Sequence, residues 1–348
     1  MDDLSAAQSE LQCANCAGQC VYDPAQQALV CSSCATRYGL ETDKDDEAAR
    51  EFDFNPDGPD VDPPVTQETR VHHCQTCGGD VVFVGPTLSE RCAYCDGPVV
   101  LATSDTGYQT KALIPFRVPE RDAQVAALDW AARRFAAPSD LRAVVENARV
   151  AGLYVPFWTF DSDEAVQYWA KYNVRRNKRM VTHSTSGALR IAFDDLLVPA
   201  SSHVTPLIRD GILHDFEPRR LRPYRPGYLA GFGAERHHQS VADGLKANED
   251  DKDLLIRNRI KGHVNKSGVH SIRYTTDTSG IRYRRILLPV WILHYTYNDT
   301  AMKIVVCGMQ GRTYGERPFS IGKLALYAAG LSALTIAFGL AWGAGGLL

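Results

Sequence analysis

The side chains best suited to chemistry in this sequence are its ten cysteines, eight of which form four C-x-x-C pairs. Fourteen residues separate the first pair from the second, and fourteen separate the third from the fourth. Each pair can form a turn that presents two thiolates, and two facing turns supply four sulfur ligands in a tetrahedron. The eight predicted metal ligands are Cys13, Cys16, Cys31, Cys34, Cys74, Cys77, Cys92 and Cys95.

Tetrahedral sites made of four sulfurs hold zinc or, less often, iron. We expect two structural Zn²⁺ sites, because four thiolates leave no coordination position for a reacting water. The first twelve residues, MDDLSAAQSELQ, are acidic and lack the apolar stretch of a signal peptide. Thiols in a reducing compartment serve as metal ligands more often than as disulfides, so we expect the soluble part to be cytoplasmic.

The remaining reactive groups give no catalytic pattern. The sequence contains no G-x-x-x-x-G-K-[ST], H-E-x-x-H or G-x-S-x-G motif, which argues against nucleotide hydrolysis and two common types of hydrolase. We therefore expect a protein that is not an enzyme, although a site inside its central region remains an alternative. We expect Cys307 to be a small buried residue. The histidines are expected to be scattered over the surface: His72, His73, His203, His214, His237 and His238.

The elements that position the cysteines are predicted to be two small β ribbons in a chain of the α+β class. We place zinc ribbons at residues 11–40 and 71–102. Between them, residues 41–70 are rich in Asp, Glu and Pro and poor in apolar residues, so they are expected to form an acidic disordered linker. Gly18, Gly78, Gly79 and Gly97 follow the cysteine turns, where a positive φ is expected.

The central body is predicted to hold two similar α+β units. Val155-Pro-Phe-Trp158 resembles Leu288-Pro-Val-Trp291, and Ile114-Pro-Phe116 more weakly resembles Arg222-Pro-Tyr224. A helix beginning near Glu120 has Val125, Leu128, Trp130 and Phe135 near helical spacing. We place the units at residues 109–200 and 213–318. Chance recurrence of proline-aromatic strand edges remains an alternative.

The C-terminal segment is predicted to be a transmembrane helix. Residues 324–342 carry no charge, and their 19 residues approach the roughly 20 needed to cross a bilayer. Arg317 and Lys323 precede the span, which would keep the body on the cytoplasmic side. Alanine recurs at every fourth position from Ala325 to Ala341, either by chance in a weakly apolar span or as a surface on which the helix packs against its own copy or another membrane helix. A buried C-terminal helix is the alternative.

Charge divides the chain unevenly. Residues 1–108 carry 5 Lys or Arg and 19 Asp or Glu, a net charge of −14, whereas residues 109–348 carry +11. Phosphate contacts require Lys and Arg, so the acidic ribbons argue against nucleic-acid binding and leave it to the basic body. The densest basic run, Arg175–Arg179, could contact anionic lipid or form a solvated hairpin tip.

Several motifs together resemble a family of bacterial zinc-ribbon membrane proteins that are often labelled primosomal protein N′ (replication factor Y) or helicase-like. The motifs are Cys92-Ala-Tyr-Cys-Asp-Gly-Pro98, Gly152-Leu-Tyr-Val-Pro-Phe-Trp158, Leu288-Pro-Val-Trp291, Gly308-Met-Gln-Gly311 and Gly315-Glu-Arg-Pro-Phe-Ser320. The resemblance covers most of residues 71–323. The ribbon at 11–40 is an addition to the family's pattern, and Cys307 stands where a polar residue is expected.

The resemblance implies an adaptor that recruits proteins to the cytoplasmic face of the bacterial inner membrane in membrane stress or maintenance. Its implied partners are flotillin-like SPFH proteins, phage-shock-protein-A-like proteins and TPM-domain membrane proteins. The alternative is a nucleic-acid-binding zinc-ribbon protein without a motor of its own, since the phosphate-binding loop is absent.

Overall fold

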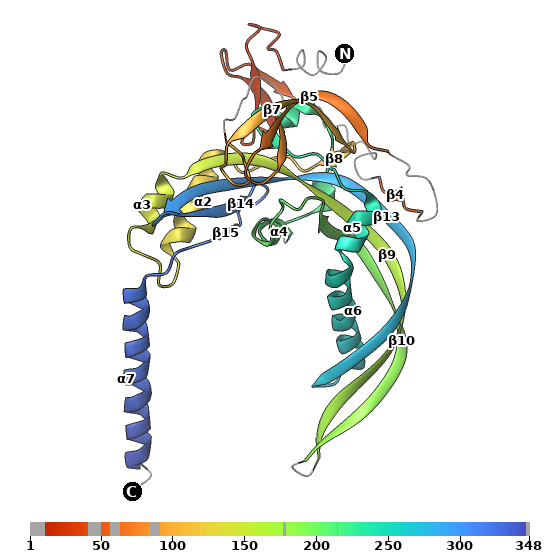
Figure 1. Cartoon of the computed structure of the whole chain (residues 1–348), viewed down its shortest axis with the longest axis vertical. Helices are drawn as coiled ribbons and strands as arrows, with labels where there is room; N and C mark the ends of the chain where they lie inside the picture. The colour runs from red at the N-terminus through yellow and green to blue at the C-terminus, as the bar shows by residue number, and fades with distance from the viewer. Residues whose placement is uncertain are drawn as a thin grey trace.

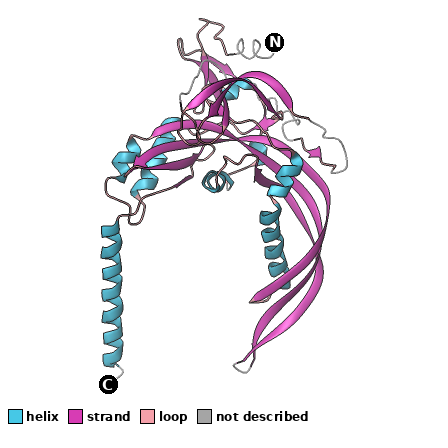
Figure 2. Cartoon of the chain, in the orientation of Figure 1, coloured by secondary structure: helices cyan, strands magenta, loops and turns pink. Residues whose placement is uncertain are grey.

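The computed structural model describes residues 11–40, 50–55, 63–83, 91–176, 179–213 and 215–345. It confirms the α+β class: a three-stranded sheet at the N-terminus, a twelve-stranded sheet, helices against that sheet, and one C-terminal apolar helix (Figures 1 and 2). The small sheet contains β1 (Cys20–Asp23), β2 (Ala28–Cys31) and β3 (Arg37–Gly39).

Four antiparallel strands form the middle of the large sheet. β9 (Arg149–Arg176) pairs with β13 (Val269–Tyr297) at the centre, and β10 (Arg179–Pro199) and β14 (Thr300–Cys307) flank them. β9, β10 and β13 continue beyond the body as a curved arm (Figure 1). On one face of the arm, α6 (Glu249–Val264) buries Ile256 and Ile260 in a cluster with Val166, Tyr168, Ala170, Ile191 and Ile272.

The two halves of the body follow one plan around the paired residues Val155 and Leu288. β8 (Ala112–Leu113) runs parallel to β13 at the two residues before Leu288. β12 (Gly233–Ala234) runs parallel to β9 at the two residues before Val155. Hydrogen bonds repeat in the same way: Pro156 O accepts from Ala200 N and Pro289 O from Gly308 N, each at 3.0 Å. β9 and β10 therefore correspond to β13 and β14, and β8 to β12.

This correspondence corrects one sequence match. We matched Ile114-Pro-Phe116 with Arg222-Pro-Tyr224, but Ile114 N donates to Leu287 O, and the equivalent bond runs from Glu235 N to Tyr154 O, both 3.1 Å. Residues 235–237 therefore take that place, and β11 (Arg222–Pro223) pairs with β8 instead. The match failed because a proline beside an aromatic residue suits any strand edge, so it does not identify a position in the sheet.

The second ribbon completes the large sheet. Its strands are β5 (Val65–Cys74), β6 (Asp80–Phe83) and β7 (Val99–Gly107), and β6 pairs with β12 as β11 pairs with β8. The strand order runs β11-β8-β13-β9-β12-β6-β5-β7. The ribbon is thus part of the body's sheet.

The expected disordered linker at 41–70 differs from the structure where its residues are described. β4 (Phe52–Asp53) pairs with β13, and β5 begins at Val65. Phe52 and Phe54 pack on a cluster that includes Trp158 and Tyr283. The acidic composition of the segment did not indicate this packing. Residues 41–49 and 56–62 of that segment lie outside the described residues.

The other helices cover the body. α2 (Glu120–Ala132) and α3 (Leu141–Glu146) lie over one end, α4 (Pro206–Leu213) over β14 and β15 (Thr313–Gly315), and α5 (Val241–Ala247) precedes α6. Short 3₁₀ turns occupy Pro218–Arg220 and Pro226–Leu229. α2 buries Ala123, Ala127 and Ala131. Of the large apolar residues that we placed on the apolar face of this helix, Val125 and Phe135 are instead more than half exposed.

α7 (Ile321–Gly345) extends away from the body. Its segment Ile321–Trp342, 22 residues long, has the length and apolar composition needed to cross a membrane, and it is not buried in the protein. Contacts with the loop after α2 hold its first turns: Lys323 Nζ donates to Ala137 O at 2.7 Å, and Tyr327 stacks on Phe135.

Candidate metal centres

The first cysteine group lies at one end of the small sheet, where the first residue of β1, Cys20, pairs with the last residue of β2, Cys31. Cys13 Sγ lies 3.5 Å from Cys34 Sγ, Cys16 Sγ lies 3.5 Å from Cys31 Sγ, and all four sulfurs lie within 4.8 Å of one another. Zinc–sulfur bonds of about 2.3 Å in a tetrahedron place sulfurs about 3.8 Å apart, so the group fits a metal of this kind. The hydroxyl of Tyr38, 3.1 Å from Cys13 Sγ, lowers the pKa of that thiol to about 5, which favours the metal-binding thiolate.

The second group has the same geometry. Cys74 Sγ is 3.5 Å from Cys95 Sγ, Cys77 Sγ is 3.8 Å from Cys92 Sγ, and these four sulfurs also lie within 4.8 Å of one another. Burial raises the pKa of Cys74, but N–H donors from Cys77 and Thr76 outweigh it and lower the pKa to about 7. The eight predicted ligands therefore come together in two four-cysteine clusters that are compatible with structural metal binding.

The expectation of positive φ at the glycines after the cysteine turns is confirmed at Gly78 and wrong at Gly18, Gly79 and Gly97. Positive φ occurs four residues after the first cysteine of each turn, at Ala17, Ala35, Gly78 and Asp96. Gly18 and Gly97 are instead needed for space, since a Cβ on Gly18 would lie 2.7 Å from Ser33 Oγ and one on Gly97 would overlap Thr76. Each glycine lets the opposite turn approach and close the four-sulfur cluster.

Two cysteines remain outside these clusters. Cys20 is buried and pairs with Cys31 across β1 and β2, and burial raises its pKa to about 11. Cys307 is fully buried at the end of β14, as expected for a small core residue. Burial disfavours the thiolate in both, so neither has the character of a reactive cysteine.

A buried polar network fastens the second cluster to the body. The Tyr94 hydroxyl donates to Glu235 Oε2, and Ser201 Oγ donates to Glu235 Oε1 at 2.7 Å. His203 Nδ1 lies 3.2 Å from Glu235 Oε1, and its Nε2 contacts the backbone oxygen of Cys77 at 2.9 Å. The hydrogen bond with Glu235 raises the pKa of His203 to about 9. The charged His203 thus donates through both ring nitrogens.

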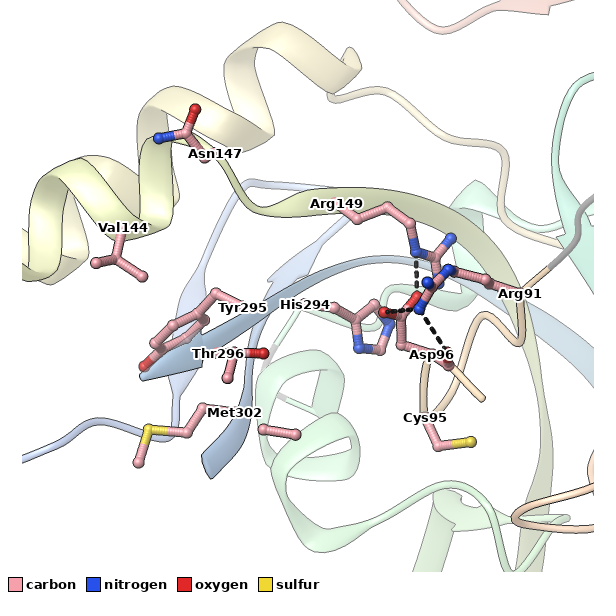
Figure 3. Close-up of a pocket in the computed structure, with 11 residues that line it drawn as sticks. Arg91, Cys95, Asp96, Val144, Asn147, Arg149, His294, Tyr295, Thr296 and Met302 are labelled. Carbon is pink, nitrogen blue, oxygen red and sulfur yellow. Dashed lines mark hydrogen bonds and ion pairs between the residues drawn. The ribbon is translucent and has the colours of Figure 1, made fainter. Parts of the chain in front are cut away.

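On its other side, the second ribbon is held by Arg149 and His294. Arg149 pairs with Asp96 and donates to Cys92 O at 2.8 Å, while His294 Nε2 contacts Ala93 O at 2.8 Å. Arg91 also pairs with Asp96, at 3.2 Å. These groups border a cavity of about 560 Å³ between the ribbon and β13 (Figure 3).

The first ribbon is also docked on the body. Tyr22 N donates to Ala230 O at 2.9 Å, and the Tyr22 hydroxyl donates to Phe116 O at 3.1 Å. The Tyr22 ring packs edge-on against Tyr228 and Phe232. Both ribbons are therefore integrated with the α+β body.

Other histidines have structural surroundings. His237 is fully buried, with Nε2 3.0 Å from Phe157 O and Nδ1 3.2 Å from Thr110 Oγ1, and burial lowers its pKa to about 3. His72 is also buried, against Phe83, so the expectation of a surface position was wrong for both. His214 lies outside the described residues.

A third cluster of possible metal ligands is neutralised by arginine. Oxygens of Glu51, Asp161 and Asp195 lie within 4.8 Å of one another. Arg282 contacts Glu51 at 2.7 Å and Asp161 at 3.1 Å, while Arg284 contacts Glu51 at 3.0 Å and pairs with Asp195. Two guanidinium groups thus take the place that a cation would need.

Comparison with known proteins gives one informative similarity. The chain is 26% identical over 341 residues to a protein of Bacillus subtilis (strain 168) named uncharacterized protein YdjG, covering 92% of this chain and 93% of that one. No family model matches the chain, and no solved structure matches it. The similarity extends over nearly the full length of both proteins, so it concerns the whole arrangement and not the cysteine motifs alone.

Proposed function

We propose that this chain is a zinc-dependent adaptor, anchored in the bacterial inner membrane by α7, that recruits or organises proteins at the cytoplasmic face. The observation that carries the proposal is the combination of an exposed, apolar 22-residue segment, in which Lys323 near the start is the one charged residue, with a body that includes two four-cysteine clusters. The recruiting role and the partner classes follow from the family resemblance, and a membrane-stress or maintenance process would supply the partners.

In this proposal zinc has a structural role. Four thiolates close the coordination shell, so the metal would hold each pair of turns together without reacting. Because β6 lies in the large sheet and Tyr94 contacts Glu235, metal binding at the second cluster would also stabilise the body.

Membrane insertion requires one rearrangement. α7 and the arm extend to the same side of the body (Figure 1). Lys171, Arg175 and Arg190 are exposed on the arm, and charged side chains are costly in hydrocarbon. A bilayer around α7 cannot also contain the arm, so α7 must turn relative to it. Residues 316–320, which lack regular secondary structure, are the proposed joint, and a turn there would break the contacts that hold Lys323 and Tyr327 against the loop after α2.

The anchor is tested by membrane extraction of the full-length protein. We expect it to remain with membranes after alkaline carbonate washing, and the double variant Leu331→Lys/Leu334→Lys to be released, because both leucines are exposed on α7 and charge opposes insertion. The matched variant Leu254→Lys/Leu255→Lys, on exposed positions of α6, should stay in the membrane. Release of the wild type by carbonate would remove the anchor from the proposal.

Association through α7 is a separate part of the proposal. The alanines at every fourth position from Ala325 to Ala341 are exposed and would allow close packing against a second helix, from another copy or a partner. Replacement of Ala333 and Ala337 by Leu should weaken such association in membranes, as measured by crosslinking. Unchanged association would contradict this part.

The nucleic-acid alternative is favoured by one surface. On the outer face of the arm, Trp169 is half exposed and pairs across strands with Arg273, with Lys171 and Arg175 further along β9. An exposed aromatic ring among cations suits single-stranded nucleic acid. Salt-sensitive binding of single-stranded DNA that Trp169→Ala abolishes would make this the leading function.

A further inference from the structure

The segment before the second ribbon shows how the sheet accepts an added strand. β4 pairs with β13 so that Phe52 lies opposite Tyr283 and Asp53 opposite Arg282. Phe54 N donates to Ile281 O at 2.9 Å, and the rings of Phe52 and Tyr283 are 5.9 Å apart. Glu51 pairs with Arg282 at 2.7 Å. A short acidic and aromatic peptide is thus held by backbone bonds, an apolar contact and an ion pair.

The correspondence between the two halves identifies an equivalent edge on β9. Counting from the central pair Val155–Leu288, Arg282 and Tyr283 of β13 correspond to Arg149 and Val150 of β9. Arginine thus occupies the same place in both halves. Among the described residues, however, no strand lies beside Arg149 and Val150 on the side away from β13, because β12 reaches only Leu153 and Tyr154.

The backbone groups of Val150 point to this open edge. Alternate residues of a strand direct their N–H and C=O groups to opposite sides. Tyr154 O accepts from Glu235 N on the side away from β13, so Gly152 and Val150, two and four residues earlier, direct their groups to the same side. Within the part of the chain that the structure describes, no backbone hydrogen bond reaches Val150 on that side.

A cavity of about 460 Å³ lies at this edge, where the two ribbons meet the body. Its walls include the exposed Val21 of the first ribbon, Phe83 of the second, and Phe232 and Trp291 of the body. Arg149, which also lines the cavity, is the cation at the position equivalent to Arg282. It already pairs with Asp96, as Arg282 contacts Asp161 in addition to Glu51 of β4. Glu120 lines the cavity as well, so the apolar part of the walls suits an apolar side chain and Arg149 offers the one contact for an acidic residue beside it.

We propose that the open edge of β9 at Val150 binds an extended segment of a protein partner as an added β-strand. The segment would resemble β4: an aromatic or large apolar residue in the cavity, and an acidic residue beside it that reaches Arg149. Strand addition of this kind takes affinity from main-chain bonds and specificity from pockets for alternate side chains. This edge would be the surface by which the adaptor binds its partner, so the proposal rests on the adaptor function proposed above.

The test uses the full-length protein in detergent and a fluorescent synthetic peptide with the sequence of residues 50–55, REFDFN. We expect saturable binding by fluorescence anisotropy. Val150→Pro removes the outward N–H and leaves the β13 side unchanged, so it should weaken binding at least tenfold. Val21→Asp changes only an exposed cavity residue and adds repulsion of the acidic peptide, so it tests the site even where the proline variant is unstable. Val125→Asp, on the exposed side of α2, is the matched control and should bind as the wild type does.

Two results would overturn the proposal: no saturable binding up to about 1 mM, the weak end of specific association, or binding that both Val150→Pro and Val21→Asp leave unchanged. Co-purification from membranes separates this outcome from failure of the adaptor function. If Val21→Asp retains a partner as well as the wild type does, the adaptor function is supported and the proposal that β9 binds the partner is refuted. If the wild type retains no protein, the adaptor function fails and the peptide result alone decides the edge.

Discussion

Substitution of Tyr94 tests whether the second ribbon stabilises the body. The Tyr94 hydroxyl donates to Glu235, and both residues are buried, with Glu235 2% exposed. Tyr94→Phe removes the donor without changing the shape of the ring. Glu235 Oε2 then loses its hydrogen bond, while Oε1 keeps Ser201 and His203.

A buried acceptor that loses its donor costs about 1–3 kcal/mol, and the upper part of that range applies to a charged group. In a folded unit of about 150–250 residues each kcal/mol lowers Tm by about 2–4 °C, so we expect Tyr94→Phe to lower Tm by about 5–10 °C. The assay is thermal unfolding of the full-length protein in detergent, with metal content measured in parallel so that lost metal is not mistaken for the lost bond.

Tyr297→Phe provides the control, because its hydroxyl contacts the exposed Asp140 at 3.1 Å and should contribute less than about 0.5 kcal/mol. A double variant with Glu235→Gln should show coupling between the two positions, since they share one hydrogen bond. If Tyr94→Phe unfolds at the same temperature as Tyr297→Phe with its metal retained, the network does not join the ribbon to the body and the reasoning is refuted.

Three further predictions follow from the same structure. Cys92→Ser should lower the metal content from two ions per chain to one and expose residues 71–102 to protease; an unchanged metal content would contradict the assignment. Burial lowers the pKa of His237 to about 3, against 6.5 in the unfolded chain, so the stability contributed by its neutral form is complete above pH 6.5. That contribution falls by up to about 1.4 kcal/mol per pH unit as the pH drops toward 3. His237→Gln should make the free energy of unfolding depend less steeply on pH in this range, and an unchanged acid unfolding curve would refute the assignment. Spin labels at Thr182 and Ala341 should move apart on transfer from detergent to a lipid bilayer, because the proposed insertion of α7 requires it to turn away from the arm; equal distances would contradict the joint proposed at residues 316–320.

The sequence predicts the features that depend on local spacing. Eight cysteines in matched pairs predict both clusters, because a metal site needs only two turns and a hairpin. An uncharged run that ends the chain predicts α7, because length and apolar composition decide whether a helix can span a bilayer. The α+β class follows from the alternation of strand and helix patterns.

Features that depend on contacts distant in sequence could not be predicted in this way. Tyr94 and Glu235 are 141 residues apart, and neither stands in a recognisable motif, so nothing local indicates that they meet. The acidic composition of residues 41–70 gave no sign of β4, because the two phenylalanines there are partly buried by pairing with β13, a strand that begins more than 200 residues later. The buried face of α2 consists of alanines because the helix packs closely on the sheet, which periodicity of large apolar residues could not reveal.

The central claim, that the chain is a membrane-anchored adaptor for proteins, is tested most directly by affinity purification of the full-length protein from gently solubilised membranes, with and without nuclease. We expect a protein partner in stoichiometric amount to remain bound after nuclease treatment. Recovery of nucleic acid with replication proteins that nuclease removes would contradict it and establish the basic arm as the functional surface.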